Sequence, residues 1–275
     1  MSPIKAVIFD FIGTLTNVRG YSLEASRTVS KMKLNRAIVK AGFTVDPKSF
    51  SKAYIQAYEK YRIIRYQKFV EVTNAVWISE AINDLGYKTT PDDPRIRTAV
   101  NISFEDYLNS IELRRCAKRI LKMVSADYKL GLLSNFTYAP VIYAGLRKLD
   151  INQFFNAILI SDEVGWRKPH PKIFNEALKR LKVSAHETVY VGDSPLEDIK
   201  GAKATGMKTI FVPSQFYTLK NLHESQQKPD TIVKNLHELC EKLPDFLNSI
   251  AQTPLVRHKN FNCQTNQKAI NLLEF

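Results

Sequence analysis

Four short stretches of the sequence carry side chains that together could transfer a group to a carboxylate. They contain Asp10, Ser134, Lys168, and the pair Asp193 and Asp198. A carboxylate such as Asp10 can attack an electrophile and form a covalent intermediate, which divides one difficult step into two easier ones. A serine hydroxyl can donate a hydrogen bond to the transferred group, and a lysine can neutralise its negative charge. We therefore predict Asp10, Ser134 and Lys168 to be catalytic.

The two later aspartates indicate a divalent cation. Asp193 follows Gly192, and Asp198 lies five positions further along the chain. Mg²⁺ prefers hard carboxylate oxygens as ligands. Asp10 and Asp193 are therefore candidate magnesium ligands, and Asp198 either binds the ion or orients the groups that do.

The residues beside Asp10 and Ser134 are candidates for substrate binding. Gly13 and Thr14 form a turn in which backbone N–H groups can approach the oxygens of a transferred group closely. We predict that Phe11, Gly13, Thr14 and Asn135 contact the substrate.

Each of these residues also has a simpler interpretation. Asp10, Asp193 and Asp198 could cap helices, Ser134 could belong to a turn, and Lys168 could be a solvated loop residue. Their combination favours chemistry, because all four stretches fall at or after the ends of predicted strands.

Those strands belong to a predicted α/β core. Short apolar, β-branched runs predict strands over residues 4–9, 128–133, 157–160, 188–191, 209–212 and 229–233, with helical segments between the later ones. This alternation predicts a Rossmann-like, doubly wound parallel sheet, in which ligands bind at the carboxyl ends of the strands.

An inserted, all-helical domain is predicted after the first strand. From about residue 23 to 108 the apolar residues follow helical spacing and no strand is indicated. Asp46 and Pro47 predict a helix start, and a later helix ends at Gly86. Tyr58, Tyr61, Arg62 and Arg65 either meet an anionic substrate or form a solvated helix face.

The predicted organisation is a core over residues 1–16 and 109–250, a helical cap over residues 17–108, and a tail over residues 251–275. The tail, with a short helix predicted at residues 268–273, could pack on the core, be disordered or make an oligomer contact. A monomer and a homodimer both remain possible.

Composition excludes several classes of protein. No apolar stretch approaches the ~20 residues that cross a bilayer, and the N-terminus does not resemble a secretory signal. Cys116, Cys240 and Cys263 are too widely spaced for a disulfide framework, which favours a cytoplasmic location. The net charge of +13 is spread along the chain, which disfavours nucleic acid as a partner and is compatible with a small anionic metabolite.

The four stretches resemble the motifs of the haloacid dehalogenase (HAD) superfamily of hydrolases. The family's first motif corresponds to the stretch from Asp10 to Thr14 and its second to Ser134. The third, a lysine in Lys-Pro-x-Pro, corresponds to Lys168, and the fourth to Gly192-Asp193-Ser194 with Asp198. The resemblance covers about residues 4–235.

The resemblance implies a Rossmann-like core with a cap, an aspartate nucleophile and Mg²⁺ as cofactor. It also implies that the backbone carbonyl of Ile12 is a metal ligand, beside Asp10, Asp193 and Asp198. In family phosphatases, however, residue 12 is a second aspartate that protonates the leaving group and activates water. Isoleucine can do neither, and such general acid–base help is typically worth ~10²–10⁴-fold in rate.

Three functions follow from this departure. The leading hypothesis is Mg²⁺-dependent hydrolysis of a small phosphorylated metabolite, because the Gly192-Asp193 pair and Asp198 are present. The second is a 2-haloacid dehalogenase, because family dehalogenases expel a halide without a proton and without magnesium. The third is a non-catalytic protein that binds phosphate.

Overall fold

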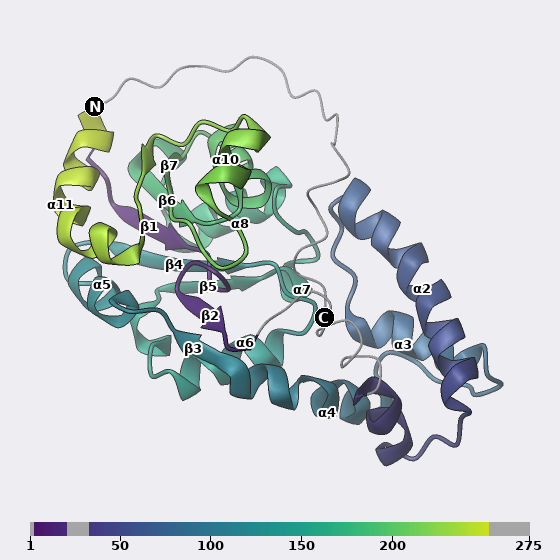
Figure 1. The fold of residues 1–275 in the computed structure, drawn as a ribbon. Coiled ribbons are helices and arrows are strands. Elements are labelled where there is room, and N and C mark those ends of the chain that lie inside the picture. Colours follow the sequence, from purple (N-terminus) through teal and green to yellow (C-terminus); the bar gives the residue numbers. More distant parts are fainter. Residues whose placement is uncertain (1–2, 21–32, 253–275) are drawn as a thin grey trace.

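The computed structural model describes residues 3–20 and 33–252, and its centre is a sheet of six parallel strands (Figure 1). Their order is β5-β4-β1-β6-β7-β8. The strands are β1 (Ala6–Phe9), β4 (Lys129–Ser134), β5 (Ala157–Ile160), β6 (Thr188–Gly192), β7 (Lys208–Phe211) and β8 (Thr231–Ile232). This arrangement confirms the predicted parallel α/β core. The sequence pattern was informative because strands of a parallel sheet are buried on both faces and are therefore continuous apolar runs.

Helices cover both faces of this sheet. They are α5 (Ala117–Val124), α6 (Ala139–Lys148), α7 (Ser161–Val164), α8 (Pro171–Leu181), α9 (Gly201–Ala204), α10 (Leu219–Ser225) and α11 (Leu236–Gln252). Val7 and Phe9 of β1 share a buried cluster with apolar residues of α5, α6 and α11. Ala6 and Ile8 point to the opposite face and share a second cluster with residues of α8 and α9. The sheet is therefore doubly wound.

Three short helical turns connect these elements. Two are 3₁₀ turns, η1 (Asn152–Phe154) and η2 (Ala185–Glu187). The third, η3 (Pro195–Lys200), is a π-helical turn that runs directly into α9. Together η3 and α9 form one continuous helical segment. The backbone N–H of Ile199 donates to the carbonyl of Ser194 at 3.1 Å, and this widened turn faces the end of β6.

Helices fill the segment between the first and second sheet strands. Residues 33–40 are helical, and α2 (Pro47–Gln67), α3 (Asn74–Asn83) and α4 (Pro94–Ser110) follow. The predicted start of α2 is confirmed, because the Asp46 carboxylate accepts a hydrogen bond from the Ser49 N–H at 2.8 Å. Figure 1 shows α2 and α3 set apart from the layered core. The domain boundaries given above stay a prediction.

A two-stranded antiparallel sheet joins the two ends of this insert, and it was not expected. It pairs β2 (Thr16–Val18) with β3 (Ile111–Leu113). Each strand has only three residues, which is too few for an alternating pattern to be visible in the sequence. The two strands lie at opposite ends of the insert in the sequence, so only folding brings them together.

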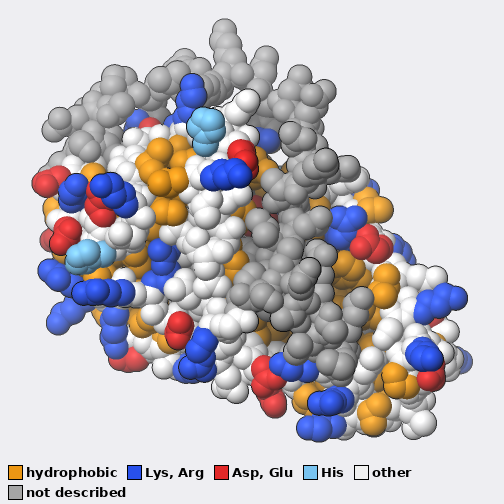
Figure 2. Space-filling view, viewed as in Figure 1, with side chains coloured by type: hydrophobic (Ala, Val, Ile, Leu, Met, Phe, Trp, Pro, Cys, Tyr) orange, Lys and Arg blue, Asp and Glu red, His pale blue; other side chains and the backbone are white. Residues whose placement is uncertain are grey.

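Charged side chains of both signs are spread over the surface. Figure 2 shows Lys and Arg interspersed with Asp and Glu on one face rather than gathered into one stripe. Among the described residues, no helix has both the length and the apolar character needed to cross a membrane. Residues 253–275, with the helix predicted at 268–273, lie outside the described residues, and α11 extends to Gln252.

Candidate active site

The carboxyl ends of β1, β4 and β6 bring the predicted site residues together. β1 pairs with β4 on one side and with β6 on the other, so Asp10, Ser134 and Asp193 lie at the same edge of the sheet. Lys168 comes from the loop before α8, and Asp198 lies in η3. All five are buried, with exposed fractions of at most 6%.

The ammonium group of Lys168 is the centre of this cluster. Its Nζ lies 2.7 Å from Asp10 Oδ1, 2.6 Å from Asp198 Oδ1, 3.0 Å from the Tyr190 hydroxyl and 3.1 Å from the Leu133 carbonyl. We call Asp10, Lys168, Tyr190 and Asp198 the Lys168 network. An ammonium carries three N–H donors, so these acceptors within the chain occupy all of them. The lysine therefore acts by orienting Asp10 and Asp198 as well as by its charge.

Asp10 keeps one oxygen without a hydrogen-bond partner. Its Oδ1 accepts from Lys168, whereas its Oδ2 is buried and has none among the described residues. Burial raises the pKa of Asp10 to about 7, although Lys168 opposes this rise; the nearby charge of Asp198 adds to it. A buried carboxylate oxygen without a partner is costly unless a ligand completes it. Oδ2 is thus the atom available to an electrophile or a cation.

The loop after Asp10 is held close to Asp193. Gly13 has a φ of +97°, and a Cβ at this position would overlap the Asp193 carboxylate. Glycine is therefore required for both conformation and space. Its N–H donates to the Thr16 carbonyl at 2.8 Å, so the turn itself uses the donor that was expected to face the substrate.

Arg114 fixes the same loop, and no pattern in the sequence indicates this role. Its guanidinium donates to the carbonyls of Gly13 at 2.5 Å, Thr14 at 3.2 Å and Pro213 at 2.9 Å. Arg114 follows β3 directly. One side chain thus ties the loops after β1 and β7 to the sheet that joins the insert to the core.

Asp193 is held by hydroxyl groups. Its Oδ2 accepts a short hydrogen bond from Ser214, and its Oδ1 lies 3.5 Å from the Thr14 hydroxyl. Burial raises the pKa of Asp193 well above its ordinary value, and the neighbouring charges of Asp10 and Asp198 raise it further. The fold therefore disfavours the charged form of Asp193, and a bound cation would stabilise that form.

The donor set fits a hard divalent cation. Carboxylate oxygens of Asp10, Asp193 and Asp198 lie within 4.8 Å of one another. One member of this group, Asp10, has an oxygen, Oδ2, that lacks a hydrogen-bond partner among the described residues. Asp198 differs from the other two, because its Oδ2 accepts from the Ser194 N–H at 2.9 Å and its Oδ1 accepts from Lys168 and Tyr190. Its contacts match the orienting role more closely than direct ligation.

The predicted substrate-binding residues are placed unevenly. Thr14 is buried between Asp10 and Asp193, as its contacts with both show. The Phe11 ring is fully buried and packs beside Gly145 of α6, so only its backbone could face a ligand. Asn135 hydrogen-bonds the backbone of Lys168 through both ends of its amide, at 2.8 and 3.0 Å, which holds the lysine in place.

Ile12 is buried beside these residues, with an exposed fraction of 7%. Its aliphatic side chain offers no proton donor or acceptor. The role expected for its backbone carbonyl stays a prediction.

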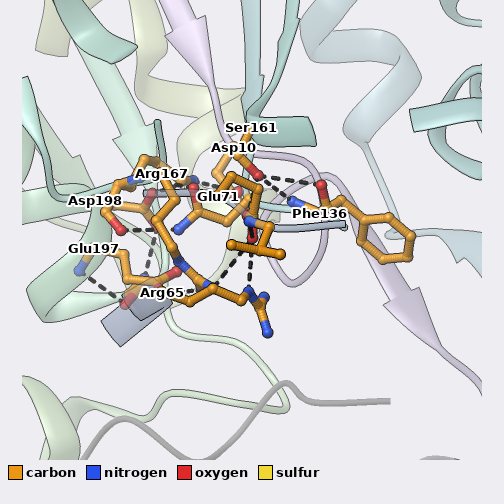
Figure 3. A network of polar contacts seen from close by, with 12 residues as sticks. Asp10, Arg65, Glu71, Phe136, Ser161, Arg167, Glu197 and Asp198 are labelled. Carbon is orange, nitrogen blue, oxygen red and sulfur yellow. Dashed lines mark hydrogen bonds and ion pairs between the residues drawn. The ribbon is translucent and has the colours of Figure 1, made fainter. Parts of the chain in front are cut away.

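A second buried charged network lies next to the first (Figure 3). It joins Arg65 and Glu71 of the insert to Ser161, Arg167 and Glu197 of the core. We call these five residues the Glu71 network. The interpretation of the basic face of α2 as a solvated face is wrong for Arg65, which is buried and pairs with Glu71.

The fold and site define a class of hydrolase in which an aspartate follows the first strand of a parallel sheet and a lysine and further aspartates follow later strands. The family model of haloacid dehalogenase-like hydrolases matches residues 7–212, which is most of the chain. The protein therefore belongs to the haloacid dehalogenase-like hydrolase family.

Several relatives carry names that state an activity. A glyceraldehyde 3-phosphate phosphatase of Methanopyrus kandleri is 29% identical over 245 residues, which cover 86% of this chain and 96% of that protein. The phosphatase of the same name from Pyrococcus furiosus is 34% identical over 133 residues, 48% of this chain. This match spans only about half (54%) of the length of the Pyrococcus protein.

Solved structures confirm the fold. A 2-haloacid dehalogenase from Pseudomonas syringae has a TM-score of 0.62 at 24% identity, over 88% of this chain and 99% of that one. A HAD phosphatase from Thermococcus onnurineus has a TM-score of 0.56 at 22% identity, over 87% of this chain and 98% of that one. The chain is a hydrolase of this family, and its site must decide which bond it cleaves.

Proposed function

We propose that this protein is a Mg²⁺-dependent phosphatase that uses Asp10 as nucleophile on a small phosphorylated metabolite. The observation that carries this proposal is the buried Oδ2 of Asp10, which lacks a hydrogen-bond partner among the described residues, in a residue whose carboxylate clusters with those of Asp193 and Asp198. A halide needs no cation at this position, whereas a phosphate brings negative charge that the carboxylates would repel. The phosphatase named in Methanopyrus kandleri supports the same reaction class.

Asp10 would act in two steps. Its Oδ2 forms a bond to phosphorus while the ester P–O bond breaks, and the electron pair leaves with the alcohol oxygen. Water then attacks the phosphorus of the aspartyl phosphate, which releases inorganic phosphate and restores the carboxylate. Lys168 holds Oδ1, so Oδ2 is the oxygen directed at the substrate. The hydroxyl of Ser134, which ends β4, would donate a hydrogen bond to a phosphoryl oxygen.

Asp193 would hold Mg²⁺ together with Asp10, and Asp198 would orient the site through Lys168 and Ser194. When bound, the ion would screen the phosphate charge from the carboxylates and polarise the P–O bonds.

The leaving alcohol must take its proton from water, because Ile12 has none to give. We therefore expect p-nitrophenyl phosphate, whose leaving group needs no proton, to be cleaved much faster than an alkyl phosphate.

The test is a panel of phosphate esters assayed with Mg²⁺ and with EDTA, using the wild type, Asp10→Asn and the surface control Asp150→Asn. Loss of the nucleophile should lower kcat at least about 10⁴-fold. Within the described part of the chain, Asp150 contacts Lys118 and Gln153 on the surface, so its variant should match the wild type. Wild-type activity in Asp10→Asn would overturn the proposal.

The alternative of a 2-haloacid dehalogenase is favoured by one observation, the aliphatic side chain at Ile12. Release of halide from 2-haloacids in EDTA, without release of phosphate from any ester, would replace the first proposal. Phosphate binding without turnover across both panels would instead indicate a non-catalytic protein.

A further inference from the structure

Glu71 is a carboxylate of the insert that is buried in the core's active-site loops. It lies between α2 and α3, and its side chain is 1% exposed. Its Oε1 accepts from Arg65 Nε at 2.7 Å and from the Val72 N–H at 3.1 Å. Its Oε2 accepts from the Ser161 hydroxyl at 2.5 Å. Both oxygens are therefore engaged, and the partners come from the insert and from the core.

The backbone on either side of Glu71 is paired with the loop that carries Lys168. The Arg167 N–H donates to the Phe69 carbonyl at 3.0 Å, and the Glu71 N–H donates to the Gly165 carbonyl at 3.0 Å. Val70 and Trp166 form the antiparallel bridge between these two hydrogen bonds. Residues 69–71 thus act as a short strand against residues 165–167, and this pairing stops one residue before Lys168.

Arg167 extends the Glu71 network toward the catalytic carboxylates. Its guanidinium lies 3.8 Å from Glu71 Oε1 and 3.2 Å from Glu197 Oε1, and 4.2 Å over the Tyr66 ring of α2. Glu197 directly precedes Asp198, and Arg167 directly precedes Lys168. Figure 3 shows Glu71, Arg167 and Glu197 in the same view as Asp10 and Asp198.

Few contacts hold the guanidinium group of Arg167. Its Nε and Nη1 are buried without a hydrogen-bond partner among the described residues. Its placement therefore depends on the charge of Glu71, the ring of Tyr66 and one hydrogen bond to Glu197. Removing the charge of Glu71 leaves the buried guanidinium with Glu197 as its remaining carboxylate partner among the described residues, which favours a local rearrangement.

The reaction requires Lys168 to be placed accurately. Its Nζ must contact Asp10 and Asp198 at the same time, at 2.7 and 2.6 Å. A shift of ~1 Å in a group that positions the reacting atoms can cost about 10²-fold in rate. Anything that fixes residues 165–167 therefore also fixes the group that directs the nucleophile.

We propose that Glu71 is a positioning residue, which fixes the Lys168 loop through Arg167 and the paired backbone and so directs Asp10. The insert would then contribute to the chemistry from a point outside the catalytic groups. This inference rests on the proposed phosphatase function for its kinetic consequence, but its structural part does not.

The experiment compares Glu71→Gln and Glu71→Ala with the wild type and with the control Glu80→Gln. Glu80 also accepts hydrogen bonds from a cation and a hydroxyl group, but its partners Lys60 and Tyr61 both belong to the insert. We expect kcat on p-nitrophenyl phosphate to fall about 10-fold in Glu71→Gln and up to about 10²-fold in Glu71→Ala. KM should change less than kcat, and Glu80→Gln should match the wild type.

A second readout does not need activity. Hydrogen exchange followed by mass spectrometry should show faster amide exchange in residues 165–168 in both Glu71 variants and not in Glu80→Gln. Arg167→Lys keeps the positive charge but loses the planar guanidinium. Its kcat, and its rate of amide exchange in residues 165–168, should therefore lie between the values of the wild type and of Glu71→Ala.

The outcomes separate the two proposals. If the role of Glu71 is purely structural, its substitution should lower the melting temperature but leave kcat, measured well below that temperature, unchanged. Amide exchange in the loop that carries Lys168 should then also be unchanged. This result would overturn the inference. Faster exchange with unchanged kcat would also overturn it. If the wild type hydrolyses no phosphate ester, the proposed function fails, and unchanged exchange in Glu71→Ala would then reject the structural part independently.

Discussion

The Lys168 network and the Glu71 network contain the same kinds of groups, carboxylates around a buried cation, yet their electrostatics differ. Burial raises the pKa of Asp10 to about 7 in the first. In the second, burial also acts to raise the pKa of Glu71, but Arg65, Arg167 and hydrogen bonds hold the pKa below its ordinary value. One network therefore holds its carboxylate in a state that favours gaining a proton, an electrophile or a cation, whereas the other stabilises its charge.

The hydrogen bonds show the cause of this difference. Both Glu71 oxygens have partners, and two arginines face one glutamate. Asp10 shares a single lysine with Asp198 and keeps Oδ2 without a partner. An incomplete set of partners is a cost to stability. It is also what leaves an atom of the Lys168 network available for reaction.

The largest expected effect concerns what the Lys168 network lacks. Ile12→Asp should raise kcat on alkyl phosphates by about 10²–10⁴-fold, because it supplies a proton for the leaving group. The gain in kcat on p-nitrophenyl phosphate should be much smaller. The ratio of kcat on the alkyl phosphate to kcat on p-nitrophenyl phosphate, compared between the variant and the wild type, measures the contribution of the supplied proton. Ile12→Asn, of matched shape, is the control. A variant that gains nothing on alkyl phosphates would mean that the site is incomplete for other reasons.

The next largest effect is on the free energy of unfolding, and loss of a carboxylate should change it differently in the two networks. Glu71→Ala should lower the free energy of unfolding by about 3–5 kcal/mol, because it removes a buried carboxylate that two buried arginines contact. Asp10→Asn, measured in EDTA, should be at least as stable as the wild type, because the fold disfavours the charge of Asp10. Urea unfolding of both variants measures the difference. Equal destabilisation would contradict the contrast between the networks.

A smaller effect is expected from Tyr190, which β6 places under Lys168. Its hydroxyl contacts Lys168 Nζ at 3.0 Å and Asp198 Oδ1 at 2.9 Å. Tyr190→Phe should lower kcat about 10- to 10²-fold, the value of one hydrogen bond to a charged group. Tyr87→Phe, which loses a hydroxyl bonded to Thr44 in the insert, is the matched control and should keep full activity.

The smallest effect is a pH dependence in the Glu71 network. A carboxyl with a lowered native pKa stabilises the fold above its unfolded pKa, and this contribution is lost as pH falls through the native value. Arg65 and Arg167 contact Glu71, and the charge of Glu71 also helps to raise the pKa of Asp162, an effect that Glu71→Gln removes. The stability difference between the wild type and Glu71→Gln should therefore be largest near neutral pH and shrink in acid. A constant difference would show that charge is not what Glu71 contributes.

Much of the core was predictable because its signals are local. Each sheet strand was predicted within two residues at both ends, since buried parallel strands are continuous apolar runs. The clustering of Asp10, Ser134, Lys168, Asp193 and Asp198 followed from strand ends meeting at one edge of a parallel sheet. Their roles in the reaction stay predictions.

The missed features depend on contacts between distant residues. Ser161 and Glu71 are 90 positions apart, and Arg114 and Gly13 are 101 positions apart. Tyr190 looks like any apolar residue of a strand, and its hydroxyl gains significance only from the lysine beside it. Nothing in the neighbourhood of Glu71 in the sequence distinguishes it from a surface glutamate.

The sequence by itself determined the family, the parallel core and the candidate nucleophile, because residue type and position after a strand suffice for these. Tertiary structure alone decided which carboxylate oxygen is free, which hydroxyl supports Lys168 and how the insert holds the catalytic loop. Desolvation and partner geometry are properties of the packed interior, where the same aspartate or glutamate becomes reactive or inert according to what is buried against it.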